Sequence, residues 1–121
     1  MSDQRFLAKY HIRRRADFRR AYGGRCTASD DLLLVFAAPN NLPYPRLGLS
    51  VSRKVGKAVA RNRWKRLVRE AFRLSREQLP VGIDLVVVPR PSAGAELQPL
   101  LRSLPQLADR AACRLTRSGG R

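Results

Sequence analysis

Hydrophobic and polar positions divide the first third of the chain into one short helix and two extended segments. A helix is predicted over 14–22, where Phe18 and Tyr22 stand four residues apart and therefore share one face. The run 31–38 is apolar and is bounded by turn residues, which predicts a strand. Residues 25–29 give a weaker strand signal. A loop rich in proline and asparagine follows.

The next segment, 46–55, alternates between apolar and small polar side chains, which is the pattern of a strand with one buried face. Leu47 and Leu49 would point into the core. Ser50 and Ser52 would point to the opposite, polar face of the sheet.

The remainder of the chain predicts a long helix, a buried strand and a final helix. A helical period runs over 57–79, and the segment 83–90 is too apolar for an exposed edge strand. Residues 96–116 are helical again, although Pro105 must either delay the start of this helix or kink it. The resulting order, α–β–β–β–α–β–α, predicts an α+β fold with a small sheet.

A length of 121 residues predicts a single domain over 1–121, with an irregular arm at 1–12 and a flexible tail at 117–121. Cys26 and Cys113 are isolated, so we expect two reduced thiols rather than a disulfide or a zinc site. The first residues lack the apolar core of a signal peptide, and no run reaches the roughly 18 apolar residues of a membrane span. We therefore expect a cytoplasmic protein without a membrane partner.

The charge of the chain predicts a polyanionic partner. Lys and Arg together number 25 against 9 Asp and Glu, a formal net charge of +16. Lysine occurs only at positions 9, 54, 57 and 65, so most of this charge is arginine. Because the guanidinium group binds phosphate in a bidentate manner and stacks on bases, a nucleic acid is favoured over other acidic partners.

The helical segment 57–73 separates core from charge. One arc of the helical wheel is apolar and contains Ala60, Trp64, Leu67, Val68, Ala71, Phe72 and Leu74. The opposite arc, here called the basic strip, contains Arg61, Asn62, Arg63, Lys65, Arg66, Arg69 and Arg73. Cations at i,i+4 spacing on a helix repel one another and cost about 0.2–0.5 kcal/mol per pair. A sequence that keeps this repulsion indicates an anionic partner, so we expect this arc to bind phosphate.

The run 48–73 closely resembles the signature of the bacterial ribonuclease P protein subunit family. Matching residues are the Gly-Leu-Ser-Val-Ser strand at 48–52, Lys54, Arg61-Asn62-Arg63, Lys65-Arg66 and Arg69. The Asp-Phe-x-x-x-Tyr pattern at 17–22 and the apolar strand at 83–89 are also similar to the family.

This resemblance implies a protein subunit of an endoribonuclease that removes the 5′ leader of precursor tRNA. It implies that helix 57–79 connects parallel strands by a left-handed crossover. It further implies contacts with the catalytic RNA by Lys54, Lys57, Arg61, Asn62, Arg63, Lys65, Arg66 and Arg69. A cleft for the single-stranded leader, here called the leader cleft, would be lined by Phe18, Tyr22, Phe36, Ser50 and Ser52.

Catalysis by the protein itself is not expected. The chain has one histidine, no Gly-rich phosphate loop and no carboxylate cluster able to hold two metal ions. Mg²⁺ would therefore be bound mainly by the partner RNA, with no catalytic residue and no metal site in this chain.

Three other classes fit parts of the pattern. A ribosomal or other structural RNA-binding protein shares the size and charge, but the ordered signature at 48–73 argues against it. A DNA-binding module would need a helix just before 57–73, where the strand-like 47–52 stands instead. A membrane-surface helix is disfavoured because Trp64 and Leu67 are needed for the core. No DNA partner is therefore expected.

Overall fold

The structure, a computed structural model, describes residues 8–24, 26–91 and 94–119. The helices are α1 (Arg15–Gly24), α2 (Ala58–Ser75) and α3 (Leu97–Gly119). The strands are β1 (Cys26–Ser29), β2 (Leu33–Pro39), β3 (Arg46–Leu49) and β4 (Ile83–Pro89). Short 3-10 turns are η1 (Ala8–Tyr10), η2 (Arg53–Val55) and η3 (Arg76–Gln78). The predicted order and the α+β class are confirmed.

The strands form one sheet in the order β1-β2-β4-β3. β1 pairs with β2 and β2 with β4 in antiparallel fashion, whereas β3 and β4 are parallel neighbours. The connection from β3 to β4 contains α2, so the predicted crossover between parallel strands is present. Its left-handedness stays a prediction. β4 lies inside the sheet, as its continuous apolar run predicts.

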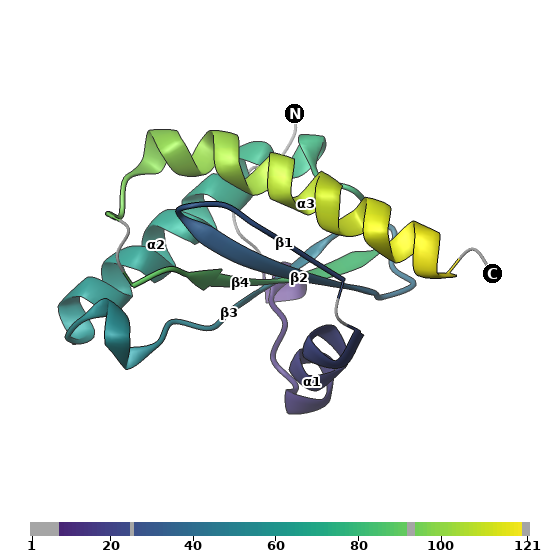
Figure 1. Cartoon of the computed structure of the whole chain (residues 1–121), viewed down its shortest axis with the longest axis horizontal. Coiled ribbons are helices and arrows are strands. Elements are labelled where there is room, and N and C mark those ends of the chain that lie inside the picture. Colours follow the sequence, from purple (N-terminus) through teal and green to yellow (C-terminus); the bar gives the residue numbers. More distant parts are fainter. Residues whose placement is uncertain (1–7, 25, 92–93, 120–121) are drawn as a thin grey trace.

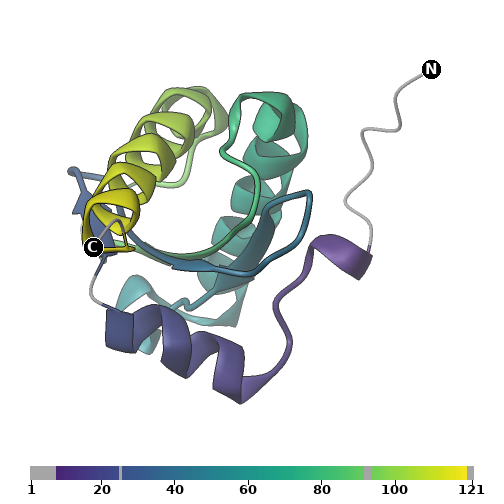
Figure 2. The ribbon, with the colours of Figure 1, turned by 90° about the vertical axis from the view of Figure 1, so that its right-hand side faces the viewer.

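Helices cover both faces of the sheet. α2 and α3 lie side by side on one face, and α1 lies on the other (Figure 1, Figure 2). Strand alternation explains this division, because Leu85 and Val87 of β4 join the large core beneath α2 and α3. Val86 and Val88, on the alternate side, join a smaller cluster beneath α1.

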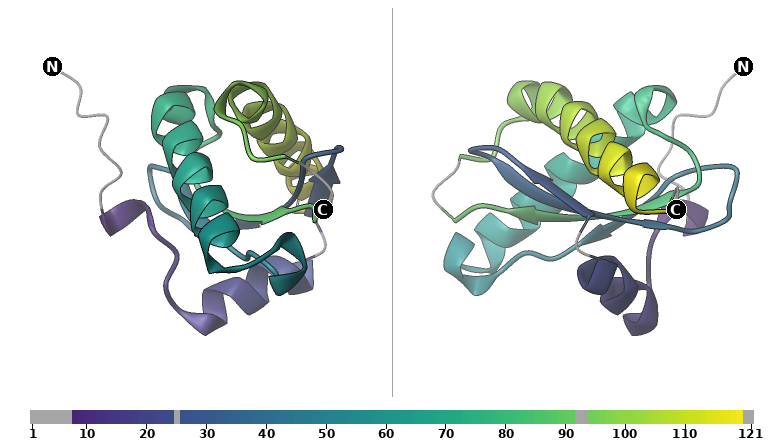
Figure 3. Two further views of the ribbon diagram at one scale, coloured as in Figure 1. Left: turned by 90° about the vertical axis from the view of Figure 1, so that its left-hand side faces the viewer. Right: turned by 45° about the vertical axis from the view of Figure 1, so that its right-hand side comes forward.

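The N-terminal segment covers the β3 edge of the sheet. His11 forms a parallel bridge with Leu47, and the Ile12 amide donates to the Leu47 carbonyl at 2.9 Å. The ring of Tyr10 packs against Phe72 of α2, with ring centroids 6.1 Å apart. Figure 3 shows η1 beside α2, and the chain then passing the sheet to reach α1. An edge strand is thereby partly protected from pairing with another chain.

Several predicted boundaries need correction. β3 ends at Leu49 rather than near 55, and the chain enters η2. α3 begins at Leu97 and continues through Pro105, so a delayed start is wrong. Proline has no N–H for the i−4 carbonyl, but burial of Pro105 in a long apolar face stabilises the helix there. α3 also reaches Gly119, inside the segment 117–121 expected to be a tail.

The helical wheel of α2 is correct at its centre and wrong at its edge. Trp64, Val68 and Phe72 are buried, as predicted. Leu74 is exposed, because it stands at the margin of the apolar arc, about 100° from the centre of the buried face. Ser75 lies close to that centre and is buried instead.

Candidate nucleic-acid interface

The basic strip of α2 lines an open groove on the protein surface. This groove has a volume of about 450 Å³ and is lined by Asn62, Lys65, Arg66, Arg69, Glu70 and Arg73. The apolar arc of the same helix fixes its orientation, since Trp64, Val68 and Phe72 are held in the core. Because the apolar arc of α2 is packed in the core, the basic strip on the other side of the helix faces the surface.

Two arginines of the basic strip have protein partners. Arg63 donates through Nε and Nη2 to the carbonyl of Ala95, at 3.3 and 3.2 Å, and so ties α2 to the segment before α3. Arg73 pairs with Glu70 at 2.6 Å, and its hydrogen bonds hold the pKa of that carboxyl below the ordinary value. The repulsion predicted along the strip is relieved at Arg73, because Glu70 provides a counter-charge there.

The remaining predicted contacts surround the start of α2. Lys54 lies in η2, and Lys57 occupies the N-cap position of α2, where its side chain forms no capping hydrogen bond. Both side chains are exposed. Arg61 is half-buried, and its Nε is fully covered without a hydrogen-bond partner among the described residues. Lys54 and Lys57 thus extend the basic strip, whose first member is Arg61, to the N-terminal end of the helix.

The aromatic residues predicted for the leader cleft gather between α1 and the sheet. Tyr22 is 37% exposed and meets Phe36 of β2 edge to face, with centroids 4.9 Å apart. Phe18 is half-buried and packs against the smaller cluster with Phe36. The phenyl ring of Phe18 lies directly over Gly48, where an added Cβ would come within 2.8 Å of it. Gly48 thus permits the close approach of α1 to β3.

The two serines of the leader cleft differ in their surroundings. The Ser50 amide donates to the Val87 carbonyl at 3.1 Å, so Ser50 continues the edge of the sheet beyond β3. Ser52 instead caps η2, where its Oγ accepts from the amide of Lys54 at 3.0 Å. Its predicted place on a strand is therefore wrong, because the chain has already left the sheet.

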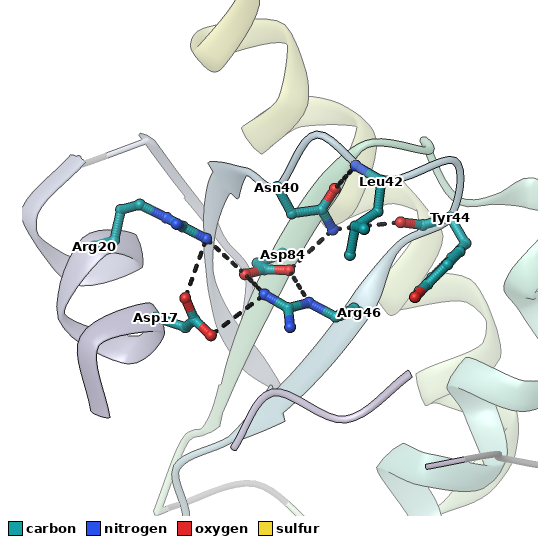
Figure 4. Close-up of polar contacts among 7 residues, drawn as sticks. All are labelled: Asp17, Arg20, Asn40, Leu42, Tyr44, Arg46 and Asp84. Atoms are coloured by element: carbon teal, nitrogen blue, oxygen red, sulfur yellow. Dashed lines mark hydrogen bonds and ion pairs between the residues drawn. The ribbon is translucent and has the colours of Figure 1, made fainter. Parts of the chain in front are cut away.

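A buried carboxylate fastens α1 to the sheet. The side chain of Asp84 on β4 is 0% exposed and accepts two hydrogen bonds from Arg46, from Nε at 2.8 Å and from Nη2 at 2.7 Å. Arg20 of α1 donates to it at 3.0 Å and Asn40 at 2.9 Å. Asp17 of α1 lies 3.4 Å from both Arg20 and Arg46 (Figure 4). Two acids and two arginines balance each other beside the leader cleft.

The basic strip and the leader cleft meet at one small hollow. This hollow has a volume of about 160 Å³ and is lined by His11, Ile12, Phe18, Leu47, Leu49, Lys65 and Arg69. Lys65 and Arg69 thus line both this hollow and the groove of the basic strip. Partial burial, and then the charges of Arg69 and Arg13, lower the pKa of His11 from its ordinary value.

Sequence patterns missed His11 and the Asp84 cluster. His11 stood alone, and only the fold brings it to Lys65 and Arg69. A signal for Asp84 was present, because a single acid inside the apolar run 83–89 must be paired if that strand is central. The partner could not be identified, since Arg46 and Arg20 are remote in sequence.

The described residues contain neither a metal-binding cluster nor a membrane-spanning helix. They contain no group of three or more His, Cys, Asp or Glu side chains placed to hold a metal ion. Within the same residues, no helix has the length and apolar character needed to cross a membrane.

Comparisons with known proteins agree with the fold. The family model described as Ribonuclease P matches residues 6–112. The Ribonuclease P protein component of Desulfovibrio desulfuricans is 47% identical, over 77% of this chain and 81% of the relative. That of Methylococcus capsulatus is 46% identical, over 82% of this chain and 78% of the relative.

Solved structures show the same likeness. The RNase P protein of Staphylococcus aureus matches with a TM-score of 0.74 and 32% identity, covering 84% of this chain and 94% of that one. The protein from Thermotoga maritima matches with a TM-score of 0.73 and 33% identity, covering 83% of this chain and 96% of that one. The chain therefore belongs to the family of ribonuclease P protein components.

Proposed function

We propose that this protein binds two RNAs at once through adjoining surfaces, the catalytic RNA at the basic strip and the 5′ leader of precursor tRNA at the leader cleft. As a ribonuclease P protein component, the chain is a subunit of the endoribonuclease that matures the 5′ ends of tRNAs. The division of labour between its surfaces is the proposal.

The observation that carries this proposal is the hollow shared by both surfaces. Phe18 of the leader cleft and Lys65 and Arg69 of the basic strip line the same 160 Å³ space. Cations along α2 suit the phosphates of a folded RNA, whose binding depends on neutralised charge. Aromatic rings suit unpaired bases, which stack at about 1–3 kcal/mol per base regardless of identity. The two RNAs would therefore be held next to each other at this hollow.

The chemistry of cleavage is assigned to the RNA partner. Hydrolysis of a phosphodiester uses metal ions to activate water and stabilise the leaving oxygen. We assign the Mg²⁺ ions mainly to the catalytic RNA. The protein would contribute by neutralising phosphate repulsion and by holding the leader, which positions the scissile bond.

The test separates the two surfaces with two variants. Arg61→Gln with Arg66→Gln should weaken binding of the protein to the catalytic RNA and reduce the salt dependence of log K by about 1.8, for two lost phosphate contacts. Tyr22→Ala should instead weaken binding of precursor tRNA to the assembled complex by about 1–3 kcal/mol, roughly 5- to 150-fold. Mature tRNA should bind the Tyr22→Ala complex as tightly as wild type.

Two control variants distinguish loss of a specific contact from the general effect of removing positive charge or an aromatic side chain. Arg102→Gln with Arg114→Gln removes the same charge from exposed positions of α3. Tyr22→Phe keeps the ring and its contact with Phe36. Both controls should behave as wild type. If Tyr22→Ala weakens the binding of precursor and mature tRNA equally, the leader cleft is refuted. If the Arg61→Gln, Arg66→Gln variant keeps the wild-type salt dependence of log K, the catalytic RNA does not contact α2.

A further inference from the structure

Phe18 also lines a second hollow, to which α2 contributes no residue. This open hollow has a volume of about 450 Å³, and its lining residues are Arg15, Phe18 and Arg19, all from α1. Phe18 therefore lines two basic hollows, one containing Lys65 and Arg69 and the other containing Arg15 and Arg19.

Arg15 and Arg19 have no counter-charge within the described part of the chain. Both side chains are exposed, and among the described residues no carboxylate or hydrogen-bond acceptor contacts either guanidinium group. The acid nearest in sequence, Asp17, is engaged by Arg20 and Arg46, each at 3.4 Å. Two like charges four residues apart on a helix repel each other, so this arrangement costs stability in the free protein.

The geometry points to a phosphate-binding site on α1: we propose that Arg15 and Arg19 bind backbone phosphates of the precursor tRNA leader while one of its bases stacks on Phe18. This inference rests on the proposed function and names a part of the leader path. Residues at i and i+4 have Cβ atoms about 5–6 Å apart, so their side chains can reach neighbouring phosphates. The guanidinium group matches phosphate oxygens in a bidentate manner.

The alternatives to this ligand are less well supported. A protein carboxylate would satisfy one guanidinium group, but two arginines and an aromatic residue line this hollow. That combination fits a ligand in which phosphates alternate with bases. Phosphates of the catalytic RNA have the same chemistry. They are disfavoured because the hollow is lined by α1 residues alone, with none from the basic strip. α1 lies on the opposite face of the sheet from α2 and α3 (Figure 2). The experiment distinguishes these two sources.

The experiment titrates the assembled complex with precursor tRNA, with precursor whose leader is truncated, and with mature tRNA. Arg15→Gln with Arg19→Gln should weaken binding of the full precursor only. Two lost single-strand contacts should reduce the salt dependence of log K by about 1.4, so the loss should be about sevenfold larger at about 50 mM than at about 200 mM salt. A leader carrying neutral methylphosphonates should bind wild type and the variant equally.

The outcomes separate this inference from the proposed function. Arg102→Gln with Arg114→Gln is the charge-matched control and should leave precursor binding unchanged. If the double α1 variant keeps the wild-type salt slope while Tyr22→Ala loses leader binding, the phosphate site is refuted and the leader cleft stands. If the α1 variant instead weakens mature tRNA binding or assembly with the catalytic RNA to the same degree, the site does not belong to the leader. Wild-type protein giving no preference for precursor would refute the proposed function itself.

Discussion

Arg46→Met tests whether electrostatics hold α1 on the sheet. Methionine preserves the length of the apolar stem but removes the two hydrogen bonds at 2.8 and 2.7 Å and the contact with Asp17 at 3.4 Å. Those hydrogen bonds to Asp84 are also the main reason that the pKa of Arg46 lies above its ordinary value. Asp84 would keep Arg20 and Asn40 as partners, although Arg20 is 47% exposed.

The magnitude follows from the burial of Asp84. Breaking a buried ion pair by removing one partner costs about 3–5 kcal/mol, because a charge is left without compensation. Since two partners remain, we expect the low end, a loss of about 3 kcal/mol in the free energy of unfolding. The double variant Arg46→Met with Asp84→Leu should recover much of this loss, because no buried charge is then left uncompensated.

The assay is urea unfolding of the purified protein at fixed salt, followed by circular dichroism. Arg53→Met is the matched control, because Arg53 is exposed and has no side-chain partner among the described residues. It should change stability by no more than about 0.5 kcal/mol. A loss equally small for Arg46→Met, or a double variant less stable than the single one, would refute the reasoning.

Two further predictions concern Gly48 and His11. Gly48→Ala would place a Cβ 2.8 Å from the Phe18 ring. The free energy of unfolding in urea should therefore fall by about 1–3 kcal/mol, and precursor tRNA should bind more weakly. If neither value changes, α1 moves freely to accommodate the added methyl group. The pKa of His11 is lowered in the folded protein, so the unfolded chain takes up a proton more readily as pH falls below about 6.5, and stability declines there. His11→Gln should reduce this decline when unfolding is compared above and below that pH, and an identical pH dependence would contradict the assignment.

Sequence patterns predicted the elements that local periodicity determines. The apolar arc of α2 and the continuous apolar run of β4 each identified a buried element, because burial there repeats with the period of the backbone. The same patterns could not place Ser52 or Leu74 correctly, since a strand end and the margin of an arc depend on what the rest of the chain covers.

The candidate site was predictable only in part, for a physical reason. The residues of the basic strip are close together in sequence and lie on one helix, so helical periodicity alone identifies them. The small hollow shared by Phe18, Lys65 and Arg69 needs α1 to dock so that Phe18 lies over Gly48. That docking depends on Asp84, Arg46 and Arg20 meeting across long separations in sequence. Residue pairs so far apart leave no periodic trace. Their contacts emerge only from the fold.

The place of β4 between β2 and β3 has a consequence for synthesis on the ribosome. Until residue 89 has emerged, the sheet can contain only the β1–β2 hairpin, because β3 has no other strand neighbour. β4, which joins β3 to the rest of the sheet, is made after α2, and α3 is made last. At about 5–20 residues per second, the basic helix is exposed for several seconds without its core partners. The nascent protein is therefore a cationic amphipathic chain before it is a folded RNA-binding domain.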